Sequence, residues 1–352
     1  MAYDIAVIPG DGVGTEVTDA SLPVAERVAA AAGVTIDTTQ FDWGSDRYLD
    51  DGQMMPDDGL SRLAGFDAIF LGAVGHPEVP DSTTLRGLRL KIVKGFQQHV
   101  CIRPTRLFEG VEGPLRGYDP GDIDFVVYRQ NTEGEYADIG GREFQGTTRE
   151  VAVQSALFTR EGTETIVRAA FEAASDREGQ LTSVTKSNAQ AYGMVFWDDV
   201  VETVGKEYPD VTVERLLVDA ASMDFVRRPH ELDVVVASNL FGDILTDIGA
   251  IVGGSIGLAP SANIDPTRDR PSMFEPVHGS AFDIMGEGIA NPIAAVRSWA
   301  MLFDHLEEAA VAEELERIVT AQLADPDAPR SPDLGGAAST EAVAADLVER
   351  ID

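Results

Sequence analysis

The stretch LDVVVASNLFGDILTD, residues 232–247, decides how this chain folds. Its first part, Leu232 to Ala237, is a short apolar run typical of a buried strand, and residues 240–250 continue with a helical pattern. A buried strand that leads directly into a helix predicts an α/β protein, in which helices cover a largely parallel sheet. Asp243 and Asp247 are four residues apart, so a helix would place both carboxylates on one face.

The same alternation extends in both directions from this stretch. Further buried strands are predicted at 4–9, 67–71 and 124–128. The predicted helices are 25–31, 162–175, 190–204, 291–307, 309–323 and 340–350. No repeat of fixed period and no low-complexity linker divides the chain, so composition alone does not place a domain boundary.

The composition excludes several classes of protein. The chain has 352 residues and a formal net charge of -33, from 60 acidic and 27 basic side chains. Such a surface repels nucleic acid and anionic membranes, so we expect neither as a partner. Cys101 is the single cysteine, which rules out an internal disulfide framework. Without a basic secretory n-region or a long apolar span, a cytoplasmic protein is expected.

The basic residues are unevenly chosen as well. Only four are lysines (Lys91, Lys94, Lys186 and Lys206), so 23 of the 27 are arginines. Acid excess with few lysines resembles the proteins of salt-accumulating halophiles. A merely acidic cytosolic enzyme is the alternative.

Three aspartates suggest a metal site. Asp243 and Asp247 share a helix face, and Asp219 closes another apolar run at a predicted strand-to-helix junction. Ligand sets made only of oxygen suit Mg²⁺ or Mn²⁺ rather than zinc. In so acidic a chain, however, a solvated acidic face explains the spacing equally well.

Four other side chains are candidates for substrate binding and proton transfer. Arg103 and Arg129 each lie at or just after an apolar run, and arginine grips a carboxylate in bidentate fashion. Lys186 follows a strand-like run, and a lysine near carboxylates and a metal can have its pKa moved, which makes it a candidate base. Tyr136 is a candidate proton donor. The alternatives are surface ion pairs for the arginines and a packing role for the tyrosine.

Two glycine-rich segments differ in what they predict. Residues 10–14, GDGVG, resemble a nucleotide fingerprint, but the third glycine comes one residue early, so a tight strand-to-helix turn is favoured. Residues 275–291, EPVHGSAFDIMGEGIAN, are dense in small residues that let a flat ligand approach the backbone. An acid there would bind a ribose diol and repel a 2′-phosphate, which favours NAD. A structured turn is the alternative.

Taken together, these segments resemble the β-decarboxylating dehydrogenases, the family of isocitrate and isopropylmalate dehydrogenases. The resemblance runs nearly end to end, and residues 239–247 and 275–291 are its most specific parts. Within the family, residues 54–58, 106–111, 131–136, 234–240 and 260–264 look most like the members that act on tartrate and D-malate. The resemblance implies a two-domain α/β fold with a mixed, largely parallel sheet, distinct from the Rossmann fold. Its first domain would join 1–100 with 252–352, and its second would be 101–251.

The resemblance also implies roles for particular residues. Tyr136 and Lys186 match the proton-transfer pair, and Arg103 and Arg129 match residues that grip the substrate carboxylates. The metal ligands would be Asp219, Asp243 and Asp247. The cofactor loop would contribute His278, Gly279, Ser280, Ala281, Asp283 and Asn291. The family is at least dimeric, and its active sites are shared, so Lys186 and Asp219 would face Asp243 and Asp247 of a second copy.

Three positions depart from the family pattern. Val93 stands where an arginine is usual, Gln130 replaces a glutamate and Phe282 replaces a proline. Arg89 and Arg86, about one and two turns earlier on a helix expected around 83–93, would then supply the missing charge. They disfavour the isopropyl pocket of a 3-isopropylmalate dehydrogenase, because burying an unpaired arginine there costs several kcal/mol.

The expected activity is therefore NAD- and metal-dependent oxidative decarboxylation of a small 2-hydroxy dicarboxylic acid of the D-malate or tartrate type. Isocitrate-like acids, 3-isopropylmalate and a non-catalytic regulatory subunit are the alternatives.

Overall fold

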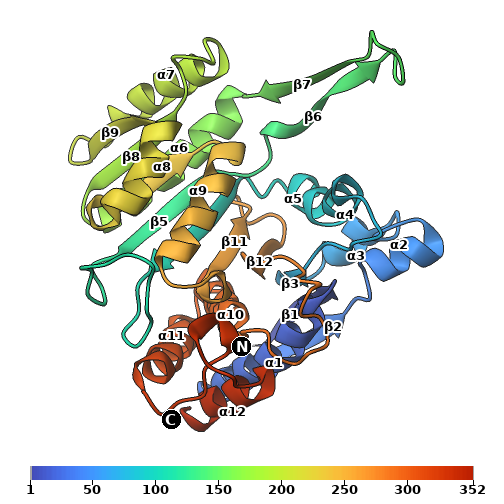
Figure 1. The fold of residues 1–352 in the computed structure, drawn as a ribbon, viewed down its shortest axis with the longest axis vertical. Helices are drawn as coiled ribbons and strands as arrows, with labels where there is room; N and C mark the ends of the chain where they lie inside the picture. Colours follow the sequence, from blue (N-terminus) through green and yellow to red (C-terminus); the bar gives the residue numbers. More distant parts are fainter. Residues whose placement is uncertain (1, 352) are drawn as a thin grey trace.

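Ten strands form one mixed sheet that runs through the whole molecule (Figure 1). The computed structural model describes residues 2–351. In order across the sheet the strands are β2 (Thr35–Gln40), β1 (Ala2–Gly10), β3 (Ala68–Ala73), β12 (Ser272–Pro276), β11 (Pro260–Ile264), β4 (Val100–Arg106), β5 (Asp124–Gln130), β10 (Val234–Ala237), β8 (Gln180–Thr185) and β9 (Thr212–Leu217). Neighbours pair in parallel except at the centre, where β11 is antiparallel to β12 and β4, and β4 to β5. The predicted mixed, largely parallel sheet is confirmed.

Helices flank this sheet. They are α1 (Val13–Ala31), α2 (Ser45–Asp51), α3 (Gly59–Leu63), α4 (Asp81–Gly87), α5 (Arg89–Gly95), α6 (Arg160–Asp176), α7 (Gly193–Gly205), α8 (Val218–Arg227), α9 (Asn239–Val252), α10 (Ile293–His305), α11 (Ala309–Ala324) and α12 (Thr340–Glu349). The seven helices predicted at 25–31, 162–175, 190–204, 240–250, 291–307, 309–323 and 340–350 are confirmed with shifted ends. The segment around 83–93 differs, because Leu88 leaves the helical region (φ -128°, ψ -78°) and separates α4 from α5.

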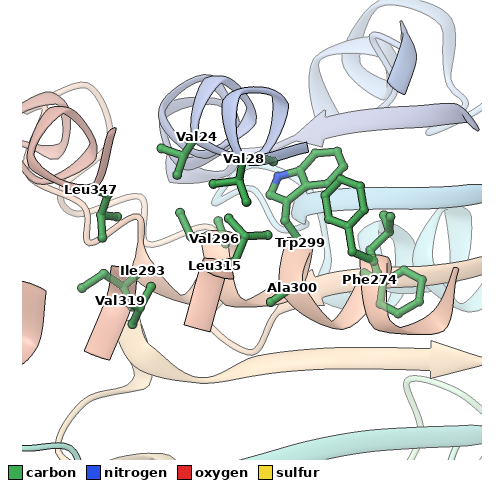
Figure 2. Close-up of a cluster of buried hydrophobic side chains, with 14 of the residues drawn as sticks. Val24, Val28, Phe274, Ile293, Val296, Trp299, Ala300, Leu315, Val319 and Leu347 are labelled. Carbon is green, nitrogen blue, oxygen red and sulfur yellow. The ribbon is translucent and has the colours of Figure 1, made fainter. Parts of the chain in front are cut away.

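Separate apolar cores lie on the two halves of the sheet. One packs α1, α10, α11 and α12 together, with the Trp299 and Phe70 rings stacked 4.3 Å apart (Figure 2). A smaller cluster around Trp43 and Met273 covers the other face of the same strands. The third surrounds β5, β8 and β10 and contains buried Trp197. The antiparallel strands β4 and β11 join the two halves, and the candidate site lies at this junction.

An antiparallel ribbon, β6 (Gly134–Glu143) and β7 (Val151–Leu157), extends away from the main sheet (Figure 1). Its surface carries exposed apolar side chains: Ile139, Phe144, Val151, Val153 and Leu157. The ladder is irregular near its base, where Gly134 pairs with Leu157 but the next pair is Ile139 with Ser155. Residues 135–138 therefore bulge out of the ribbon.

Among residues 2–351, no helix combines the length and the apolar character needed to cross a membrane.

Candidate active site

The register of two antiparallel strands brings Arg103 and Arg129 together. Arg103 on β4 faces Val127, and Arg129 on β5 faces Cys101, so the two arginines are diagonal neighbours on one face of the sheet. Both side chains are buried. Two buried guanidinium groups on one face are an arrangement that suits the binding of carboxylates.

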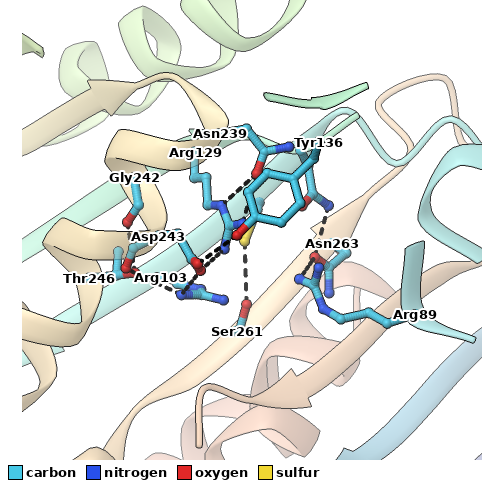
Figure 3. Close-up of polar contacts among 12 residues, drawn as sticks. Arg89, Arg103, Arg129, Tyr136, Asn239, Gly242, Asp243, Thr246, Ser261 and Asn263 are labelled. Carbon is cyan, nitrogen blue, oxygen red and sulfur yellow. Dashed lines mark hydrogen bonds and ion pairs between the residues drawn. The ribbon is translucent and has the colours of Figure 1, made fainter. Parts of the chain in front are cut away.

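Asp243 on α9 lies against both arginines (Figure 3). Its Oδ1 pairs with Arg129 Nη1 and lies 3.4 Å from Arg103 Nη1, which also donates to Thr246 Oγ1 at 2.7 Å. Burial acts to raise the pKa of Asp243, but the charges of Arg129 and Arg103 outweigh it and hold that pKa below its ordinary value. Asp243 is therefore ionised and lies at the centre of a positive site.

Tyr136 on β6 completes this cluster. Its hydroxyl donates to Asp243 Oδ2 at 3.1 Å, and its ring lies 5.6 Å from the Arg129 guanidinium carbon. Burial and the charge of Asp243 raise the pKa of Tyr136 above its ordinary value. The phenol stays protonated across the neutral range, as a proton donor requires.

The other two predicted metal ligands lie differently. Asp247 follows Asp243 by one helical turn, and burial together with the charge of Asp243 raises its pKa. Asp219, in the first turn of α8, forms an ion pair with Lys186. No group of three histidine, cysteine or acidic side chains suited to a metal occurs within residues 2–351. One chain therefore does not gather the three predicted aspartates by itself.

A cavity of about 160 Å³ opens beside this cluster. Its lining includes Arg103, Arg129, Tyr136 and Asp243, and also Arg89 on α5. The buried Arg89 donates to Glu275 Oε1 at 2.7 Å and to Asn263 Oδ1 at 3.1 Å. Three guanidinium groups and two carboxylates thus line one small polar cavity.

Two other positions of α4 and α5, Val93 and Arg86, lie outside the cavity lining. Val93 is fully buried in the apolar cluster around Trp43, so this position does not face the cavity lining. Arg86 does not line the cavity either. Its guanidinium pairs with Asp138 on β6, and its role in substrate binding stays a prediction.

The predicted cofactor loop follows β12 and borders two cavities. His278 and Gly279 line the polar cavity, whereas His278, Ala281 and Asn291 line a mostly apolar neighbour of about 370 Å³. Burial lowers the pKa of His278, and its Nδ1 lies 3.0 Å from Gly279 O. Its Nε2 is buried without a partner among the described residues, so a neutral His278 presents a free acceptor.

The early glycine turn supports this loop instead of forming a phosphate site of its own. Gly10 and Gly12 both have positive φ, and a Cβ on Gly12 would lie 2.0 Å from the Ser280 carbonyl oxygen. The same oxygen accepts from Val13 N at 2.8 Å. Asp11 is buried and accepts from Ser45 and from Gly75 N, which ties together the loops around it. The prediction of a tight strand-to-helix turn is confirmed.

Other loop residues have distinct environments. Asn291 accepts from Ile293 N at 3.0 Å and donates to Asp333 at 3.0 Å, so both ends of its amide are occupied. Asp283 is exposed. Phe282 lies edge-to-face with His76, at 4.8 Å between ring centroids. Outside the loop, Gln130 at the end of β5 is buried. Its Nε2 donates to Thr132 Oγ1, and its Oε1 accepts from Glu133 N.

Sequence reasoning missed several partners of the site. Asn239 accepts from Arg129 Nε at 3.1 Å and Nη2 at 2.7 Å, which fixes the guanidinium plane. Asn239 could have been found from the sequence, because it lies one helical turn before Asp243 in the stretch 232–247. Glu275 and Asn263, which hold Arg89, come from strands whose pairing no local pattern reveals.

Comparison with known proteins agrees with this geometry. The family model described as isocitrate/isopropylmalate dehydrogenase matches residues 4–351. The chain belongs to this family. A probable tartrate dehydrogenase/decarboxylase from Agrobacterium vitis is 49% identical over 99% of this chain and 98% of its own length. The D-malate dehydrogenase [decarboxylating] of Escherichia coli is 47% identical over 97% and 96%.

Two further relatives mark the breadth of the family. A 3-isopropylmalate dehydrogenase from Thermobifida fusca is 46% identical, covering 99% of this chain and 97% of its own. The crystal structure of isocitrate dehydrogenase from Methylococcus capsulatus superposes with a TM-score of 0.89 at 32% identity, over 99% of both chains. The predicted family and fold class are confirmed, and the names of the Agrobacterium vitis and Escherichia coli relatives describe decarboxylating dehydrogenases. Because the tartrate, D-malate and 3-isopropylmalate relatives are 49%, 47% and 46% identical, overall sequence identity does not tell which of these substrates the chain uses.

Proposed function

We propose that this protein catalyses the NAD- and divalent-metal-dependent oxidative decarboxylation of a small 2-hydroxy dicarboxylic acid, of the D-malate or tartrate type. The observation that carries the proposal is one small cavity in which Arg103, Arg129, Tyr136 and Asp243 converge beside the loop that starts at His278. Paired guanidinium groups suit a dicarboxylate, and a protonated tyrosine beside them suits proton delivery.

The residues present fit a divalent metal ion. Asp243 and Asp247 stand one turn apart on α9, and burial together with the charge of Asp243 raises the pKa of Asp247, so a cation between the two carboxylates would relieve their repulsion. Oxygen ligands of this kind are those that Mg²⁺ and Mn²⁺ prefer. We assign Asp219 as a third ligand contributed by a second copy, because no described group of three forms within one chain.

The apolar cavity beside His278 fits the adenosine part of NAD. Its small and aliphatic lining, from Ala281, Ile284 and Ile289 among others, suits a flat base, and the free Nε2 of His278 offers an acceptor. Asp283 is exposed nearby in sequence, where an acid would favour NAD over a 2′-phosphorylated cofactor.

The chain's own residues account for binding and proton movement. Arg103 and Arg129 hold the carboxylates, and Lys186 of a second copy takes the proton of the C2 hydroxyl. After the β-carboxylate leaves as CO₂, Tyr136 gives its proton to C3 of the enolate. The bound cofactor supplies the hydride acceptor, and the metal supplies polarisation of the C2 oxygen.

A homodimer with shared sites follows from this assignment. Lys186 and Asp219 pair with each other, their side chains 28% and 61% exposed, and neither lines the cavity. The exposed apolar side chains of the β6–β7 ribbon offer a surface for the second copy. We propose the domain division 1–100 plus 252–352 and 101–251, which agrees with the separate cores, and a cytoplasmic, salt-adapted enzyme.

Substrate choice follows from the cavity walls. Arg89 is buried there and paired with Glu275, so the wall on this side is polar where an isopropyl group would need apolar lining. The test is NAD⁺ reduction by the purified chain with Mn²⁺ on D-malate, tartrate, isocitrate and 3-isopropylmalate. We expect the highest kcat/KM on D-malate or tartrate, and a higher value on 3-isopropylmalate would refute this order.

A further inference from the structure

The segment that carries Tyr136 lacks the support of a regular ladder. Between Gly134 and Ile139 the β6–β7 pairing is irregular, and Asp138 has a positive φ of 64°. Main-chain carbonyls in such a bulge lose their strand partners and need others. Gln154 serves one of them, since its Nε2 donates to Glu135 O at 2.8 Å.

Two cations from α4 and α5 hold the rest of the bulge. Lys94 Nζ donates to the main-chain oxygen of Tyr136 at 2.5 Å, and Arg86 pairs with the carboxylate of Asp138. Lys94 is part-buried, and burial lowers its pKa, while the charge of Asp138 acts in the opposite direction. These contacts join α4 and α5 to the β6–β7 ribbon, beside the residue Tyr136 that lines the polar cavity.

We propose that Lys94 is a positioning residue for Tyr136, with Arg86 in support. Lys94 fixes the main chain of Tyr136 from one side, while Asp243 and Arg129 engage its side chain from the other. The hydroxyl is thereby aimed into the cavity, where it gives its proton to C3 of the enolate, and the new C–H bond forms as the C2 carbonyl is restored. Water then returns a proton to the phenolate. The catalytic half of this inference rests on the proposed function.

Lys91, on the same helix α5, provides a matched control for the substitution of Lys94. It makes no hydrogen bond or ion pair with the described part of the chain. Lys91→Met and Lys94→Met thus make the same change in side chain, three residues apart, but only the second removes a donor to Tyr136. Lys94→Arg keeps the charge and a donor.

The first experiment measures the mobility of the Tyr136 segment and does not depend on enzymatic activity. Amide hydrogen exchange of residues 133–143 in the free protein should accelerate about 10- to 100-fold in Lys94→Met, the opening factor expected from a single charge-assisted hydrogen bond. Lys91→Met should match the wild type, and Arg86→Met should show a smaller change because its ion pair is exposed. Equal exchange in Lys94→Met and Lys91→Met would overturn the inference.

The second readout follows proton transfer itself. Wild-type enzyme with Mn²⁺ in deuterated water should catalyse deuterium exchange at C3 of pyruvate, monitored by proton NMR. Lys94→Met should slow this exchange and kcat with little change in KM for the hydroxy acid, and Lys94→Arg should restore most of it. Undiminished exchange in Lys94→Met would overturn the inference, whereas failure of the wild type on all four hydroxy acids would overturn the proposed function alone.

Discussion

Replacing Tyr136 with phenylalanine separates its chemistry from its packing. The variant loses the hydroxyl that donates to Asp243 Oδ2 at 3.1 Å but keeps the ring that lies against Arg129. Asp243 keeps its pairs with Arg129 and Arg103, and its side chain is 35% exposed. We therefore expect a stability loss of only about 1 kcal/mol and a Tm lowered by no more than about 4 °C.

The effect on turnover should be far larger. Loss of a general acid reduces rates about 10²- to 10⁴-fold, and kcat should fall by such a factor while KM changes little, because both arginines that bind the substrate remain. NADH formation measured by absorbance gives both constants. Tyr118→Phe is the matched control, since its hydroxyl donates to Arg227 O outside the cavity. Equal turnover in the two variants would refute the assignment of Tyr136 as proton donor.

Four further predictions follow from the site and the surface charge. Lys186→Met should lower turnover at least about 100-fold with the fold intact, and mixing it with Asp243→Asn should restore roughly a quarter of wild-type activity if sites are shared in a dimer; no recovery on mixing would contradict shared sites. Asp283→Arg should raise the NADP-to-NAD ratio of kcat/KM at least about tenfold, and an unchanged ratio would remove Asp283 from cofactor choice. Since the pKa of Asp247 is raised, its ionised form destabilises the metal-free protein at neutral pH. Asp247→Asn should therefore raise Tm at neutral pH, less as pH falls toward about 4, and should weaken stabilisation by Mn²⁺; a lower Tm without metal would contradict this. Finally, with a net charge of -33, Tm should rise with KCl, and a Tm independent of salt would argue against salt adaptation.

The sequence predicted those features of the fold that depend on local patterns of residues. The buried run before Asn239 and the helical pattern after it predicted β10 and α9, and with them the shared face of Asp243 and Asp247. The proximity of Arg103 and Arg129 could not be predicted from residues alone, because it depends on the antiparallel register of β4 and β5.

Contacts between distant segments could not be predicted either, because they too depend on how the strands pair. The pairing of Arg89 with Glu275 joins residues 186 positions apart, and the pairing of Lys94 with Tyr136 O depends on a bulge in β6. The break at Leu88 separates Arg89, which lines the cavity, from Arg86, which pairs with Asp138 on β6. Its only local signal is Gly87, and a single glycine costs a helix only about 1 kcal/mol, too little to predict a break by itself.

One measurement tests the central claim most directly: the products formed from D-malate by the purified chain with NAD⁺ and Mn²⁺. The account predicts that NADH and CO₂ appear in equal amounts and that both stop when EDTA removes the metal. NADH without CO₂, or neither product from D-malate or tartrate, would contradict it, and the second result would favour a non-catalytic subunit.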